Sequence, residues 1–210
     1  MTYFTATQKT VQALTALAML STVPQSLAAV INFDSLAGPV ALTNQYAAQG
    51  IMFNQIEATS QFATSLVSVS APNYATPFYS NANPGSFWFV DPATNAAAYV
   101  SSVSLTFNGY NNVGGWFDGA TIQALDVSNT VIAGQTQTLN PSTGTNYGST
   151  TLTFTGQVHE LLFTNILNTN GLGILPFDNV TFGALTPTPE PSTWLLAASA
   201  LAAGCLRRRR

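Results

Sequence analysis

The sequence contains very little charge. Only 6% of its 210 residues are Asp, Glu, Lys or Arg, against about 25% in an average soluble protein. The few basic residues are Lys9 and four arginines at the end of the chain, so the stretch from Val30 to Thr186 has no Lys or Arg and seven acidic residues. Nucleic acids and anionic lipids are bound through basic side chains that displace counterions. We therefore expect this stretch to bind neither of them.

Cysteine and histidine are nearly absent as well. The single cysteine, Cys205, rules out an intrachain disulfide and CxxC metal or redox motifs, and one histidine, His159, is too few for a usual zinc site. No Gly-x-Ser-x-Gly elbow occurs, so a Ser-His-Asp hydrolase is unsupported and His159 is expected to be an exposed strand residue. A pair of acidic residues acting on a glycosidic bond stays open as the weaker, enzymatic alternative.

The first 28 residues have the order of a secretory signal peptide. Lys9 precedes a mostly apolar run from Val11 to Val23, and Ser26-Leu-Ala28 is a small-x-small cleavage pattern. We predict export with cleavage after Ala28. The alternative is an ordinary amphipathic helix at the start of a cytosolic protein.

Residues 29–186 alternate apolar and polar side chains with a period of two, as half-buried strands do. Clusters of Gly, Asn and Pro separate the strand candidates. This pattern predicts an all-β domain, a single jelly-roll-like β-sandwich. The expected strands are Val30–Phe33, Ile51–Phe53, Leu66–Val69, Ser86–Val90, Val103–Phe107, Thr121–Val127, Val131–Ala133, Thr151–Thr155, Val158–Phe163 and Val180–Phe182.

The last 24 residues, 187–210, form a tail in three parts. Pro187-Thr-Pro-Glu-Pro191 favours an extended backbone, because proline fixes φ and disfavours helix in the residue before it. Residues 194–206 are 13 mostly apolar residues, which as a helix reach only about 20 Å across a hydrocarbon core near 30 Å. The membrane anchors would be an interfacial tryptophan and a cytoplasmic basic cluster, Trp194, Arg207, Arg208, Arg209 and Arg210.

This order of a Pro-Glu-Pro motif, a short apolar helix and terminal arginines resembles the PEP-CTERM sorting signal of Gram-negative bacteria. The resemblance implies that an exosortase recognises Pro189, Glu190 and Pro191 and removes the tail, leaving the protein at the cell surface or in the extracellular matrix, often beside exopolysaccharide. The short helix with Cys205 near its end departs from the family pattern. A plain tail anchor with a proline-rich spacer is the alternative.

A second resemblance concerns the domain itself. Ile31-Asn-Phe-Asp34 with Asn44–Phe53, and Phe177–Phe182, are similar to the first and last strands of secreted β-sandwiches related to galactose-binding-like carbohydrate modules. It implies that these strands are neighbours, so Asp34 and Asp178 would share one Ca²⁺, a cation that prefers carboxylate and carbonyl oxygens. Otherwise both aspartates cap turns. No other cofactor is expected.

A sugar-binding patch is predicted in one Gly-rich loop. Residues 108–118 contain Tyr110 and Trp116 for stacking on a sugar ring, with Asp118 to accept hydrogen bonds from its hydroxyls. Core packing is the competing role for Trp116, and Trp88 is expected in the core. We thus expect a non-enzymatic surface or matrix protein, with a lectin-like module on exopolysaccharide as the rival function.

Overall fold

The computed structural model describes residues 29–60, 70, 72–77, 84–108, 119–139, 149–166 and 175–188. Within them the regular secondary structure is β-strand, apart from one short 3-10 helix at Ala47–Gln49. The strands are β1 Ala29–Ile31, β2 Val40–Leu42, β3 Ile51–Asn54, β4 Ile56–Thr59, β5 Tyr74–Pro77, β6 Ser86–Phe89, β7 Ala98–Phe107, β8 Ala120–Leu125, β9 Val131–Leu139, β10 Thr150–Val158, β11 Glu160–Thr164, β12 Phe177–Phe182 and β13 Leu185–Pro187.

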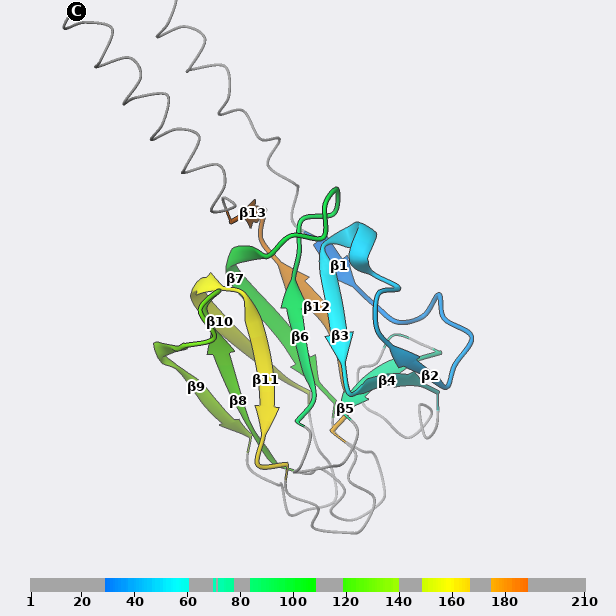
Figure 1. Ribbon diagram of the computed structural model, residues 1–210. Coiled ribbons are helices and arrows are strands. Elements are labelled where there is room, and N and C mark those ends of the chain that lie inside the picture. The colour runs from blue at the N-terminus through cyan, green and yellow to red at the C-terminus, as the bar shows by residue number, and fades with distance from the viewer. Residues whose placement is uncertain are drawn as a thin grey trace, which may run out of the picture.

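The strands form two sheets that face each other, so the predicted all-β sandwich is confirmed (Figure 1). The larger sheet has the order β10-β7-β12-β5-β4-β2, with β1 paired to β12 and β13 paired to β7. The smaller sheet has the order β3-β6-β11-β8-β9 and lies toward the viewer in Figure 1. The pairing of β1 with β12 brings the opening and closing segments together, as the resemblance implied.

Aromatic side chains fill the space between the sheets. Phe33, Phe87, Phe163 and Phe177 are each 0% exposed. The Phe163 and Phe177 rings stack with their centroids 5.3 Å apart, and the Phe33 ring meets the Phe177 ring edge-on at 5.9 Å. Because no disulfide crosslinks the domain, this packed aromatic cluster supplies the main stabilisation of the fold.

The two sheets are joined along one side by glutamine side chains. Gln137 on β9 donates from Nε2 to the carbonyl of Thr153 on β10 at 2.6 Å, and the Thr155 N–H donates to Oε1 of Gln135 at 2.8 Å. β9 and β10 are the end strands of their sheets on this side. The glutamines therefore occupy backbone groups that an edge strand would otherwise present to another chain.

Both ends of the described chain lie at one end of the sandwich. Ala29 pairs with Phe182, and Pro187 pairs with Ala98 at the start of β7. β1 and β13 accordingly appear close together at the top of Figure 1. At the opposite end Phe107 pairs with Thr150 and Phe177.

Two expectations for single residues are wrong. Trp88 is partly exposed on the outer face of β6 and not in the core, since Phe87 and Phe89 on either side take the inward positions. His159 lies between β10 and β11 and not within a strand, and its half-buried ring contacts the Ala98 carbonyl through Nδ1 at 2.6 Å. The His159 carbonyl also accepts the Phe89 N–H at 2.8 Å, so this residue links β7 of the larger sheet to β6 of the smaller one.

Candidate functional site

Asp178, at the start of β12, is a fully buried carboxylate. Its Oδ2 accepts hydrogen bonds from the Ser70 N–H at 3.0 Å and the Ser70 hydroxyl at 2.7 Å, and its Oδ1 accepts the Asn179 N–H at 2.7 Å. Burial raises the pKa of Asp178 because the charged form loses its hydration, although these hydrogen bonds act in the lowering direction. The negative charge of Asp34 raises that pKa further.

Asp34 and Tyr46 belong to the same polar group. Asp34 follows β1 and accepts the Asn73 N–H at 3.3 Å, while the Asn73 amide donates to the Leu36 carbonyl at 2.6 Å. Tyr46 donates its hydroxyl to the Asn32 carbonyl at 3.0 Å. Burial raises the pKa of Tyr46, and the charges of Asp34 and Asp178 add to this effect. The structure thus brings the two predicted metal ligands into electrostatic contact.

The oxygen atoms around Asp34 and Asp178 provide only part of the coordination shell that a hard cation needs. Two carboxylates and nearby carbonyl oxygens are the ligand types that Ca²⁺ prefers. Among the described residues, no cluster of three or more His, Cys, Asp or Glu side chains that could hold a metal occurs. Asp34 and Asp178 would therefore need carbonyl oxygens or water to complete a coordination shell, and the existing hydrogen bonds to Asp178 would compete with the ion.

Two other aspartates act as turn caps. Asp91 accepts the Ala93 N–H at 2.9 Å and the Thr94 hydroxyl at 3.0 Å. Asp126 accepts the N–H groups of Ser128 at 2.8 Å and Thr130 at 3.0 Å. Because their oxygens are occupied by their own turns, neither is a good candidate for chemistry.

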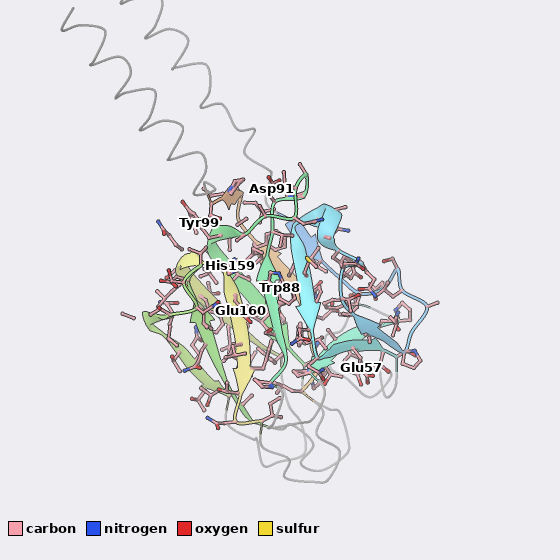
Figure 2. The ribbon with its side chains drawn as sticks, viewed as in Figure 1. Glu57, Trp88, Asp91, Tyr99, His159 and Glu160 are labelled. Carbon is pink, nitrogen blue, oxygen red and sulfur yellow. The ribbon has the colours of Figure 1, made fainter. Side chains whose placement is uncertain are left out.

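A second candidate surface is the outer face of the five-stranded sheet. Figure 2 shows Trp88 and Glu160 there on neighbouring strands, β6 and β11. They are direct partners in the register of these antiparallel strands, which places their Cβ atoms about 5 Å apart. Sequence reasoning missed this surface, although the alternation in Ser86-Phe-Trp-Phe89 carries the signal that Trp88 faces away from Phe87 and Phe89.

Several predicted residues lie outside the described residues. They are the signal peptide, the proposed sugar patch Tyr110, Trp116 and Asp118, the motif Pro189, Glu190 and Pro191, and the anchors Trp194, Arg207, Arg208, Arg209 and Arg210. In the part of the chain that is described, no helix is long and apolar enough to span a membrane. The predicted roles of these segments stay predictions.

The beginning of the tail is well defined. Pro187 is the last residue of β13, and Thr188 binds the Ala97 carbonyl through its N–H at 2.9 Å and its hydroxyl at 2.6 Å. A family model for the PEP-CTERM protein-sorting motif matches residues 187–210. The chain carries a PEP-CTERM sorting motif. This confirms the resemblance found in the tail, and the PEP-CTERM motif implies export and processing by an exosortase.

Comparison with other proteins says little about the domain. No curated protein matches the sequence. Among solved structures, the chain is similar to the K2 cleaved adhesin domain of Lys-gingipain, with a TM-score of 0.42 and 14% identity over 74% of this chain and 98% of that one. The relation to galactose-binding-like modules is not confirmed.

Proposed function

We propose that the protein is exported from a Gram-negative cell, sorted by an exosortase through its PEP-CTERM motif, and left at the cell surface or in the extracellular matrix as a non-enzymatic β-sandwich. The observation that carries this proposal is the match of the PEP-CTERM model to residues 187–210. The motif begins at Pro187, inside the last strand, so hardly any spacer separates the sandwich from the exosortase recognition element.

The arrangement of the chain ends supports this function. Ala29, the residue after the predicted signal cleavage, and Thr188, just before Pro189, are both fixed at one end of the sandwich. Removal of both terminal signals would therefore leave the described strands and their core residues in place. The opposite end would point away from the membrane during processing.

Intact mass and cell fraction of the protein in its exporting host test the proposal. We expect a mature form that lacks residues 1–28 and the tail after the PEP motif, found outside the inner membrane. Glu190→Ala should accumulate with an uncut tail in the membrane fraction. Glu57→Ala removes a carboxylate of the same type from β4. It is the matched control and should be processed normally. An uncut wild-type tail would instead make residues 194–210 a plain anchor.

Exopolysaccharide is the proposed environment and a candidate ligand. A weakly acidic, hydroxyl- and amide-rich domain without Lys or Arg suits contact with sugar polymers better than with nucleic acid or lipid. If the Gly-rich loop binds sugar, Trp116→Ala should abolish retention of the protein on polysaccharide. Unchanged retention would remove that loop from consideration, and release of reducing ends would instead indicate a hydrolase.

A structural Ca²⁺ shared by Asp34 and Asp178 is a separate proposal. It is supported by the buried Asp178 carboxylate, whose charge no Lys or Arg in the sequence from Val30 to Thr186 can neutralise. A cation that binds only the folded state raises the melting temperature by mass action. We expect Ca²⁺ to raise it in the wild type and not in Asp34→Asn or Asp178→Asn; no rise in the wild type would reject the site.

A further inference from the structure

The outer face of the five-stranded sheet carries side chains that point away from the core between the sheets. No described segment packs over this sheet, which lies at the front of Figure 1. Its inward side carries the aromatic core, including Phe87 and Phe89 at 0% exposure. Trp88, between them, is turned outward and is partly exposed, so a portion of its ring is open to solvent.

The strand register arranges the outward side chains in rows. One row crosses β3, β6 and β11 through Met52, Trp88 and Glu160. The next row crosses β3, β6, β11 and β8 through Asn54, Ser86, Leu162 and Gln123, with amides at its two ends and a buried serine beside a leucine between them. Neighbouring members of a row lie about 5 Å apart, so one indole, one carboxylate and two amides share a single flat face.

The polar groups of this face are free to accept a ligand. Among the described residues, the Trp88 indole N–H, the Glu160 carboxylate and the Gln123 amide make no hydrogen bond or ion pair. Glu57 on β4 likewise makes no such bond, whereas Asp91, Asp126 and Asp178 each accept hydrogen bonds from neighbouring donors. Free hydrogen-bonding groups around a partly exposed aromatic ring are typical of a binding surface.

We propose that this face binds a neutral polysaccharide chain. The apolar side of a sugar ring stacks on Trp88 and contacts Met52, while Glu160 accepts hydrogen bonds from sugar hydroxyls and Gln123 and Asn54 offer both donors and acceptors. The face contains a carboxylate, and the sequence from Val30 to Thr186 has no Lys or Arg. Acidic polysaccharides are therefore repelled, and neutral ones fit the charge of the surface.

This inference is independent of sorting and of the Gly-rich loop. It concerns the fold alone, so it holds whether or not an exosortase removes the tail. It also assigns binding to Trp88 on β6, whereas the loop hypothesis assigns it to Trp116. Variants of the two tryptophans therefore separate the two ideas.

Affinity electrophoresis of the full-length protein in a mild detergent tests the proposal. Native gels contain galactomannan, mixed-linkage β-glucan or, as the acidic comparison, alginate. We expect retardation by at least one neutral polymer and none by alginate, and an affinity about tenfold lower for Trp88→Ala, the size typical of a central aromatic contact. Trp88→Tyr keeps an aromatic face and should retain most of the binding, and Glu160→Gln should weaken it severalfold.

The matched control is Tyr99→Ala, which removes a half-exposed aromatic ring from β7 of the other sheet and should leave retardation unchanged. Melting curves show which variants are folded. If Trp88→Ala does not fold, the milder variants Trp88→Tyr and Glu160→Gln are used to decide the proposal. The proposal would be overturned if folded Trp88→Ala were retarded as strongly as the wild type, or if only Trp116→Ala lost binding. It would also be overturned if alginate alone retarded the protein, or if no neutral polymer did.

Discussion

Ser70 donates two hydrogen bonds to the same oxygen of Asp178, from its N–H at 3.0 Å and its hydroxyl at 2.7 Å, although 108 positions separate the two residues. This contact ties the segment before β5 to the start of β12 in the buried part of the sandwich. A carboxylate so placed satisfies three donors, two from Ser70 and one from Asn179.

Replacing Asp178 should be costly for this reason. Asp178→Ala leaves the Ser70 and Asn179 donors without their acceptor, and we expect the free energy of unfolding to fall by about 2–4 kcal/mol. Urea denaturation in EDTA at neutral pH measures the change without any contribution from a metal. Asp126→Ala, in a turn, is the matched control and should lower the free energy of unfolding by about 1 kcal/mol. Equal losses in the two variants would show that the buried hydrogen bonds of Asp178 stabilise the fold no more than those of a surface turn.

Tyr46 should give the fold a dependence on alkaline pH. Its pKa is raised by burial, so the folded state holds the phenol proton more tightly than the unfolded chain, whose tyrosine titrates near 10.0. The corresponding stability is complete below pH 10 and is lost as the pH rises through the folded pKa. In urea midpoints between pH 8 and pH 11, the wild type should lose more stability than Tyr46→Phe. Parallel curves would contradict the prediction.

Gly50 and Gly134 both adopt positive φ, at 90° and 74°, but differ in their surroundings. A Cβ on Gly50 would overlap Cδ1 of Leu185 and lie 3.2 Å from the Val90 carbonyl, whereas a Cβ on Gly134 would meet nothing within 4 Å. Gly134→Ala should cost about 1 kcal/mol from backbone strain alone, and Gly50→Ala about 3 kcal/mol because Leu185 must repack. Thermal or urea unfolding measures both, and equal costs would show that Leu185 adapts freely.

The glutamines that join β9 to β10 should limit both unfolding and self-association. Removing both with Gln135→Ala and Gln137→Ala should cost about 1–2 kcal/mol and should uncover the backbone groups of Thr153 and Thr155 on the edge strand β10. We expect concentration-dependent association in light scattering. Thr136→Ala, an exposed position between them, is the control; a double variant that stays monomeric and as stable as this control would refute the role.

Most of the strands could be predicted because their side chains alternate clearly. The patterns at Val103–Phe107 and Thr151–Thr155 correspond to parts of β7 and β10, which are longer than predicted. β2, β4, β5 and β13 were missed, since they have three or four residues and lack a clear alternation. β5 and β13 each end in proline, a residue that normally speaks against a strand.

The candidate sites were predictable to different degrees. Asp34 and Asp178 were singled out from a resemblance, and the structure places them near each other. The partners of Asp178 could not be predicted, because no sequence pattern links Ser70 to a residue 108 positions away. Trp88 was assigned to the core within an aromatic-rich segment, and only its alternation with Phe87 and Phe89 argued otherwise.

The sequence by itself determined the sorting tail and the class of the fold. A linear motif is read from consecutive residues, and the period of two in side-chain polarity follows from the geometry of a single strand. The tertiary structure decided which strands pair, which aromatic rings face the core, and which polar groups remain free. These depend on contacts between residues far apart in the chain, such as Met52 with Trp88 and Trp88 with Glu160, and no local pattern specifies them.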